Sequence, residues 1–162
     1  MERTEREIIA QYGADVLRFV SRTVHCHEDA EEVTQDVFVR ALRSLERYDE
    51  GRASMRTWLM RIAYSEAMRY HERHNKRPTM VALDERRDDS PETMDDDRRI
   101  DLLERAIRQL PDDERLLLSM RYSDGLSIRE MAFVTGMKEQ SLPVRLQRIR
   151  ERLKLEISKI RD

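Results

Sequence analysis

The stretch Gly125-Leu126-Ser127-Ile128-Arg129-Glu130-Met131-Ala132, together with the segment Ser141–Ile160 that follows it, decides the fold of this chain. Apolar residues recur in the longer segment at spacings of three or four, which places them on one stripe of an α-helix: Leu142, Leu146, Ile149, Leu153, Ile157 and Ile160. Such a stripe predicts a helix packed on a core. Between 145 and 161 the other positions carry seven Arg or Lys residues against two Glu residues. A helix with one apolar side and one cationic side suits a polyanionic partner.

The residues before this helix predict a helix-turn-helix. Ser127 can cap a short helix that runs to about Thr135, and Gly136 can supply the positive φ of a tight turn. Such a unit can place its second helix in the major groove of DNA, with Arg and Lys side chains on phosphates. Two amphipathic helices joined by a glycine turn are also common in plain helical bundles. This stretch alone leaves DNA binding and bundle packing as equal alternatives.

Composition predicts an all-α protein with one domain or two small ones. Of the 162 residues, 40% are charged and 6% are aromatic, and Gly and Pro number four each, a mixture that favours helices over strands. The single cysteine, Cys26, excludes an internal disulfide. No apolar run approaches the ~20 residues of a membrane span, and the charged N-terminus lacks the apolar stretch of a signal peptide. We therefore expect no membrane insertion and a cytoplasmic location.

An acidic segment divides the chain. Between Asp84 and Asp97, eight acids face two bases, so this segment carries a charge of −6, and the remainder sums to +4 in a chain of net charge −2. The segment is interrupted by proline and poor in apolar residues, which predicts a flexible linker without regular structure. We expect two small helical domains, residues 1–78 and 98–162, joined by the acidic linker 79–97. The helix-turn-helix lies in the second domain.

Apolar periodicity predicts further helices at 5–24, 28–45, from 55 onward, 98–109 and from Pro111 to the break at 123–125. The helix at 28–45 begins with acids and ends with bases, which complements the helix dipole; the density of the acids also suits a basic partner. The helix after Ser54 has a predicted core face around Trp58. Its end mixes bases with an aromatic residue, which suits melted nucleic acid, or a solvated helix end.

Potential metal ligands do not form a site in this sequence. Because His25, Cys26 and His27 are adjacent, they cannot all reach one ion without a contorted backbone. We expect a loop with a buried Cys26 there. His71 and His74 lie three residues apart but lack a Glu-x-x-His pattern, and no nucleophile–base pair or phosphate loop is present. We therefore expect no metal, no cofactor and no enzymatic activity.

Read as a whole, the chain resembles a bacterial sigma factor of the extracytoplasmic-function group. Four phrases carry the resemblance in order over nearly all of the chain. They are Asp29-Ala30-Glu31-Glu32-Val33-Thr34-Gln35-Asp36-Val37-Phe38-Val39-Arg40, Trp58-Leu59-Met60-Arg61-Ile62-Ala63-Tyr64, Leu110-Pro111-Asp112-Asp113-Glu114-Arg115, and Asp124-Gly125-Leu126-Ser127-Ile128-Arg129-Glu130-Met131-Ala132. The first two resemble the polymerase-binding and promoter-melting helices of the family. The last two resemble the opening and the helix-turn-helix of its second domain.

The resemblance implies a factor that binds core RNA polymerase and directs promoter recognition and melting, while the polymerase performs the catalysis. The implied contacts with the basic coiled coil of the polymerase β′ subunit are Asp29, Glu31, Glu32, Gln35 and Asp36. The implied minus-ten contacts are Asp49, Gly51, Arg52, Ser54, Arg56, Trp58, Ser65, Arg69, Arg73, Lys76 and Arg77. Among them, the loop from Asp49 to Arg56 would hold a flipped base of the minus-ten element. The implied minus-thirty-five contacts are Arg121, Gln140, Ser141, Arg145, Gln147 and Arg148. The β flap of the polymerase, promoter DNA and an anti-sigma protein are the other implied partners.

Two departures from the family pattern affect DNA recognition. Ser65 stands where the family usually has Asn near the unwound strand. Pro143 and Val144 replace a basic and a hydroxyl residue in the recognition helix. Because proline inside a helix costs roughly 3 kcal/mol, we predict that this helix begins late, with Gln140 or Ser141 as its cap and Pro143 in its first turn. Fewer contacts to duplex DNA would then remain, which motivates the alternative that the second domain docks a protein or ribonucleoprotein that selects the site.

Overall fold

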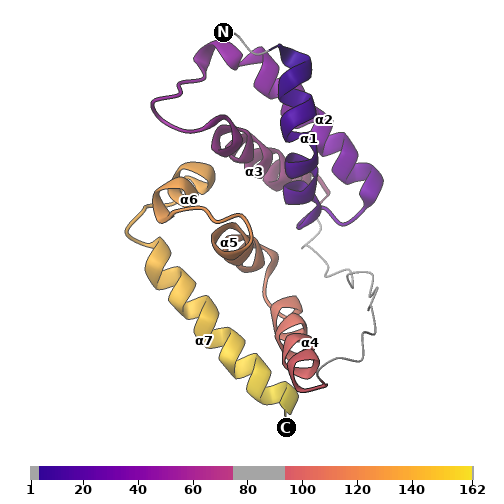
Figure 1. The fold of residues 1–162 in the computed structure, drawn as a ribbon, viewed down its shortest axis with the longest axis vertical. Coiled ribbons are helices and arrows are strands. Elements are labelled where there is room, and N and C mark those ends of the chain that lie inside the picture. Colours follow the sequence, from indigo (N-terminus) through magenta and orange to yellow (C-terminus); the bar gives the residue numbers. More distant parts are fainter. Residues whose placement is uncertain (1–3, 75–93, 162) are drawn as a thin grey trace.

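The computed structural model describes residues 4–74 and 94–161, and all regular structure within these ranges is helical (Figure 1). The first range holds three α-helices and one 3₁₀ turn, and the second holds four α-helices. Their bounds are α1 Glu5–Ser21, α2 His27–Arg43, η1 Leu45–Arg47, α3 Met55–His74, α4 Met94–Arg108, α5 Asp112–Tyr122, α6 Ile128–Thr135 and α7 Leu142–Arg161. The prediction of an all-α chain with two helical domains is confirmed.

In the first domain α1, α2 and α3 pack against one another. A capping box begins α1, because the Glu7 N–H donates to Thr4 Oγ1 at 3.4 Å and the Thr4 N–H donates to the Glu7 carboxylate at 3.3 Å. Ser54 caps α3 as predicted, and its hydroxyl oxygen accepts the Thr57 N–H at 3.2 Å. The buried faces of the three helices include Ile8, Val16, Phe19, Val20, Ala30, Val33, Val37, Ala41, Leu59, Ala63 and Ala67.

In the second domain α4 and α7 run antiparallel, and α5 and α6 pack on the first half of α7 (Figure 1). The Ser127 hydroxyl accepts the Glu130 N–H at 3.1 Å, and the Glu130 carboxylate accepts the Ser127 N–H at 3.0 Å. Gly136 then ends α6 with φ of +76°, a conformation that glycine adopts without strain. The predicted apolar stripe of α7 is buried at Leu142, Leu146, Ile149 and Leu153. The predicted helix-turn-helix is confirmed.

The start of α7 shows how the chain accommodates its proline. Pro143 is the second residue of the helix, where its missing N–H leaves no helical hydrogen bond unmade. The Ser141 carbonyl accepts the Arg145 N–H at 3.1 Å, so the backbone of Ser141 stands at the cap position. Its hydroxyl, however, donates to the Lys138 carbonyl at 2.8 Å. The predicted late start is confirmed, and Ser141 caps through its backbone alone.

The two domains pack on each other through α3 and α6 (Figure 1). Buried apolar residues of both domains form one continuous cluster, which runs from the core of α1 to α3 into that of α5 to α7. Burial of apolar surface at such a contact stabilises the association of the domains, because it removes that surface from water. The sequence pattern had not specified this arrangement.

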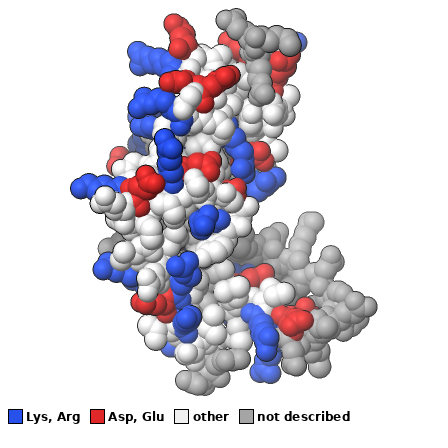
Figure 2. Space-filling view, turned by 60° about the vertical axis from the view of Figure 1, so that its left-hand side comes forward, with Lys and Arg blue, Asp and Glu red and all other residues white. Residues whose placement is uncertain are grey.

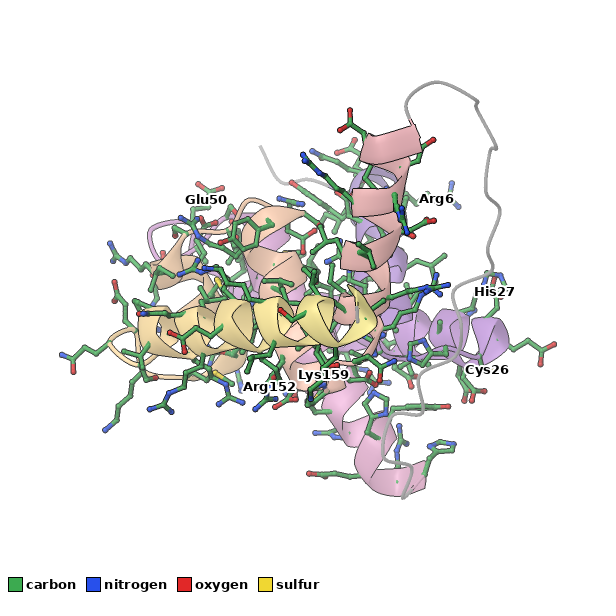
Figure 3. All side chains as sticks on the ribbon, turned by 90° about the horizontal axis from the view of Figure 1, so that it is seen from below. Arg6, Cys26, His27, Glu50, Arg152 and Lys159 are labelled. Atoms are coloured by element: carbon green, nitrogen blue, oxygen red, sulfur yellow. The ribbon has the colours of Figure 1, made fainter. Side chains whose placement is uncertain are left out.

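Two local predictions are wrong, and a third is confirmed in part. The predicted linker 79–97 overlaps α4, which begins at Met94. Asp96 and Asp97 favour this helix, because acids near a helix N-terminus complement the helix dipole. The rest of the predicted linker lies within 75–93, outside the described residues. Cys26 is exposed, since it stands at the N-cap of α2 and at the outer end of that helix (Figure 3). The predicted core face of α3 is buried at Leu59, Ile62, Ala63, Ala67 and Tyr70, whereas Trp58 is only half-buried and packs against the core from its edge.

Candidate nucleic-acid interface

The loop before α3 and the first half of α3 enclose a cavity of about 460 Å³. Its lining residues are Arg40, Ser44, Arg47, Asp49, Arg52, Ala53, Trp58, Arg61, Ile62, Ser65 and Phe133. Four of these are arginines, and Asp49 is the one carboxylate among them. A cavity with such an excess of guanidinium groups beside an indole ring offers both phosphate contacts and a stacking surface.

Four of the predicted minus-ten residues line this cavity: Asp49, Arg52, Trp58 and Ser65. Sequence reasoning missed three of its arginines, Arg40, Arg47 and Arg61. Helical spacing could have identified Arg61, because it lies three residues after Trp58 and four before Ser65 and so shares their face of α3. Arg40 belongs to α2, and no local pattern relates it to α3.

Hydrogen bonds and ring contacts fix the loop that forms one wall of the cavity. The Tyr48 hydroxyl donates to the Ala53 carbonyl at 3.0 Å, and the Tyr48 ring lies 5.1 Å from that of Trp58. The Asp49 carboxylate accepts the Gly51 N–H at 2.9 Å. The loop is therefore held in shape before any ligand arrives, and Asp49 contributes to that shape.

On α3, Ser65 is held by a polar cluster at the edge of the cavity. The Arg40 guanidinium donates to Ser65 Oγ at 3.2 Å and to the buried Glu66 carboxylate at 3.0 Å. Glu66 also lies 3.6 Å from the Arg69 guanidinium. One buried carboxylate thus pairs with both Arg40 and Arg69, and the Ser65 hydroxyl accepts a hydrogen bond from the first of these two cations.

The end of α3 presents cations but no exposed tyrosine ring. Arg69 and Arg73 are exposed, whereas Tyr70 is buried and its hydroxyl donates to the Asp29 carboxylate at 2.5 Å. Burial and then that hydrogen bond raise the pKa of Tyr70 to about 12. The idea that this aromatic ring offers a stacking surface for bases is therefore wrong. Two further predicted residues, Lys76 and Arg77, lie outside the described residues.

The acids of α2 form a second surface. Glu31, Glu32, Gln35 and Asp36 are exposed, and Glu31 lies 3.0 Å from the His27 imidazole. Asp29, the fifth residue of the predicted set, is half-buried and binds the Tyr70 hydroxyl. We call the exposed group Glu31, Glu32, Gln35 and Asp36 the α2 acidic face.

Several cations of the helix-turn-helix are bound within the domain. Arg121 donates to the Leu126 carbonyl at 2.9 Å, and Arg145 pairs with Asp113 at 3.0 Å. Arg152 pairs with Glu114 at 2.7 Å on the side of α7 shown in Figure 3, and Arg150 donates to the Tyr122 hydroxyl at 2.7 Å. The other predicted minus-thirty-five residues are exposed: Gln140, Ser141, Gln147 and Arg148.

These pairs change the charge pattern that the sequence suggests for α7. On the face shown in Figure 2, acidic and basic side chains are interspersed and do not gather into one large basic patch. The first turn of α5 supplies the acids for Arg145 and Arg152, and no periodicity links these positions in the sequence. A ligand of α7 would have to compete with intramolecular partners for two of its arginines.

Two further kinds of feature, a metal site and a membrane span, are absent from the parts of the chain that the structure describes. No group of three or more His, Cys, Asp or Glu side chains there could hold a metal ion. No helix within 4–74 or 94–161 is both long and apolar enough to cross a membrane.

Comparison with known proteins identifies the family. The family model for sigma-70 region 2 matches residues 8–77, and that for sigma-70 region 4 matches residues 100–153. RNA polymerase sigma-H factor of Pseudomonas aeruginosa is 30% identical over 160 residues, which cover 89% of this chain and 81% of that protein. RNA polymerase sigma factor YlaC of Bacillus subtilis is 28% identical, with 96% and 93% covered. ECF RNA polymerase sigma-E factor of Escherichia coli is 29% identical, with 89% and 81% covered.

A solved structure shares the fold. The sigma factor RpoE of Bartonella quintana, in complex with the anti-sigma factor NepR, matches with a TM-score of 0.65 at 17% identity. The match covers 94% of this chain and 96% of that chain. Both family models fall on the helical domains described above, one on each, and together they span most of the chain. The chain belongs to the extracytoplasmic-function group of sigma factors and directs transcription initiation by RNA polymerase.

Proposed function

We propose that this sigma factor docks on core RNA polymerase through the α2 acidic face and holds an unpaired base of the minus-ten element in the cavity beside α3. The observation that carries the proposal is that one small domain presents both surfaces. Its acids lie on α2, and its arginine-lined cavity lies between α2, the following loop and α3. The cavity reaches α2 only beyond the acids, at Arg40, so it stands close to, but apart from, the α2 acidic face.

Docking through α2 requires a basic partner surface. Three exposed carboxylates within six residues on one helix suit the basic coiled coil of the β′ subunit, and the second domain would contact the β flap. Complementary charges of this kind raise the rate of association and fix its orientation. Asp29 is assigned a different role here, because it is half-buried and accepts the Tyr70 hydroxyl. It holds α2 on α3.

Minus-ten recognition requires that a base leave the duplex. Extrusion costs a few kcal/mol, and stacking on an aromatic ring returns about 1–3 kcal/mol per base. Trp58, held by Tyr48, supplies the ring, and Arg52 and Arg61 supply charge for the adjoining phosphates. Gly51 and Ser54 act by shaping the loop and by capping α3. Arg69, Arg73, Lys76 and Arg77 would follow the opened strand.

Charge reversal on α2 tests the docking surface. We expect Glu31→Lys, Glu32→Lys and Asp36→Lys together to abolish binding to core polymerase, because three attractive contacts become repulsive. The control carries Glu46→Lys, Glu50→Lys and Glu72→Lys, which make the same charge change at exposed positions of the same domain. Core binding is measured by pull-down and helix content by circular dichroism. Undiminished binding of the α2 variant with unchanged helix content would reject this surface.

The remaining features follow from this role. The chain itself would use no cofactor or metal and would catalyse no reaction, since bond formation belongs to the polymerase. It would act in the bacterial cytoplasm, where transcription occurs. An anti-sigma protein is a candidate partner, supported by the complex that the structural relative forms with one.

A second candidate concerns how the promoter is selected. Pro143 and Val144 occupy the start of α7, and Arg145 is paired with Asp113. These features favour weak reading of the minus-thirty-five element and selection of the site by a protein or ribonucleoprotein docked on the second domain. Tight, sequence-selective binding of the full chain to duplex DNA would reject this alternative.

A further inference from the structure

A groove of about 1000 Å³ lies in the first domain, beside the loop that precedes α3. The start of α1, the end of α2, η1 and that loop contribute its walls. The residues that line it are Thr4, Glu5, Ile8, Tyr12, Leu42, Leu45, Glu46, Tyr48, Glu50, Ser54 and Met55. None of these residues lines the arginine-rich cavity beside α3, so the groove is a distinct concave surface.

The floor of the groove is apolar. Six of its lining residues are aliphatic, aromatic or sulfur-containing: Ile8, Tyr12, Leu42, Leu45, Tyr48 and Met55. Ile8 is buried, whereas the other five are half-buried and so remain partly accessible to a ligand. Large apolar side chains gathered at a concave surface are typical of binding sites. The floor therefore suits a partner that brings apolar side chains of its own.

The rim of the groove is acidic. Glu5, Glu46 and Glu50 are exposed there, and no Lys or Arg is among the described residues that line the groove. The cavity beside α3 has the opposite charge pattern, with four arginines and one carboxylate. Because like charges repel, the groove disfavours nucleic acid and favours a cationic ligand.

We propose that this groove docks a short amphipathic segment of a regulatory protein, in which large apolar side chains lie next to Lys or Arg. The apolar side chains would fill the floor at Leu45 and Met55, and the cations would pair with Glu46 and Glu50 at the rim. An amphipathic helix that binds a groove in this way spaces its apolar anchors three or four residues apart. The groove meets α2 only at Leu42, near the end of that helix, so the segment and the core polymerase would bind different parts of α2.

The groove and the cavity share the loop before α3. Tyr48, Glu50 and Ser54 line the groove, whereas Asp49, Arg52 and Ala53 line the cavity. The Tyr48 ring also lies 5.1 Å from the ring of Trp58, which lines the cavity. A ligand stabilises the conformation that it binds best. A segment in the groove would therefore stabilise the loop shape that forms the cavity wall. Its effect on DNA rests on the minus-ten role proposed above, whereas the docking itself does not.

A synthetic peptide tests the docking. The probe is a fluorescein-labelled helical peptide of Leu and Lys, with its Leu residues on one face, added to the full chain. Fluorescence anisotropy should show binding that is several-fold weaker for Glu46→Lys with Glu50→Lys. The control, Glu72→Lys with Glu151→Lys, makes the same charge change at exposed positions outside the groove and should keep the wild-type affinity. No binding to the wild type, or equal affinity for all three proteins, would overturn the docking.

The apolar floor has a test of its own. Met55→Gln makes the first residue of α3 polar at similar size, and should weaken peptide binding several-fold. Leu155→Gln makes the same kind of change at an exposed position of α7 and should leave binding unchanged. A second peptide with Glu in place of Lys should bind the wild type more weakly. Equal binding of the two peptides, or equal affinity of the two apolar variants with helix content intact, would overturn the proposed ligand chemistry.

Two other occupants of the groove give different results with the same probe. Displacement of the peptide by core polymerase would assign the groove to the polymerase. Self-association of the wild type, measured by sedimentation and abolished by Glu46→Lys with Glu50→Lys, would assign it to a second copy of the chain. Either result would overturn the assignment to a regulatory protein.

Hydrogen exchange tests the effect on the loop. Bound peptide should slow amide exchange at residues 48–54, and should raise the affinity of the chain for random-sequence single-stranded oligonucleotides several-fold. A peptide of the same composition in scrambled order corrects for direct binding of Lys to DNA. Unchanged exchange with the peptide bound would overturn the effect on the loop. Slowed exchange with no gain in strand affinity would instead reject the minus-ten role of the cavity, and the docking would stand.

Discussion

At the scale of single residues, short-range chemistry was predictable and long-range pairing was not. Ser54, Ser127 and Gly136 act as predicted, because capping and positive φ depend on neighbours within three or four residues. Arg145 is paired with Asp113, 32 residues earlier in the sequence, and no local sequence pattern predicts such a pair. The sequence correctly predicts many cations on α7, but it overstates how many of their side chains could bind a ligand, because some are paired within the domain.

Two histidines near the domain boundary make stability depend on pH. His25, in the loop between α1 and α2, lies 3.9 Å from Asp112 of α5, whose carboxylate is already bound by Arg115. Burial lowers the pKa of His25, and the charge of Arg115 lowers it further. Burial also lowers the pKa of His71, with His25 and His74 adding to the effect. Folding therefore favours the neutral form of both imidazoles.

The sign of the effect follows from proton binding. Below the unfolded histidine pKa of about 6.5 the unfolded chain binds more protons than the folded chain, so the free energy of unfolding falls as the pH drops through that value. The variant His25→Gln with His71→Gln should lose less stability on acidification, as measured by urea unfolding at neutral and mildly acidic pH. His27→Gln, at an exposed position, should keep the wild-type loss. An equal loss in all three proteins would contradict the assignment.

At the scale of elements, the bounds of helices followed from periodicity wherever a stop signal was present. The late start of α7 was predicted because proline tolerates only the first turn of a helix. The start of α4 was missed, since an acidic segment can be either a linker or the dipole-stabilised first turn of a helix. Periodicity placed Trp58 and Leu59 together on the core face of α3; Leu59 is fully buried, and Trp58 packs half-buried at the edge of the core.

The first turn of α7 offers a direct test of duplex reading. Pro143→Lys with Val144→Ser restores the residue types usual in the family at two exposed positions. We expect tighter duplex binding and a salt dependence whose logarithmic slope grows by about 0.9, the value for one added phosphate contact. Fluorescence anisotropy over a salt series measures both. The control, Ser158→Lys, adds a charge near the other end of α7; an equal gain there would show that the start of α7 has no special access to DNA.

At the scale of the whole molecule, the two-domain plan was predictable from the acidic segment, but the packing of the domains was not. Arg22, Thr57 and Asp124 lie in segments far apart in the chain, and each looks like an ordinary polar surface residue in its own helix or turn. The cavity was likewise only half predictable, because its arginines come from α2, the loop and α3, and its last wall is Phe133 of α6. Sequence patterns specify the faces of helices, and tertiary structure decides which faces meet (Figure 1).

The central claim is that this chain is an adaptor that carries an acidic docking face and a cationic strand-binding cavity to core RNA polymerase. Sequencing of transcript start sites, made in vitro by core polymerase on genomic DNA with and without the chain, tests it most directly. We predict start sites that occur only when the chain is present and that share a common sequence about one helical turn upstream. Start sites that are the same with and without the chain, while circular dichroism shows its helices intact, would contradict the claim.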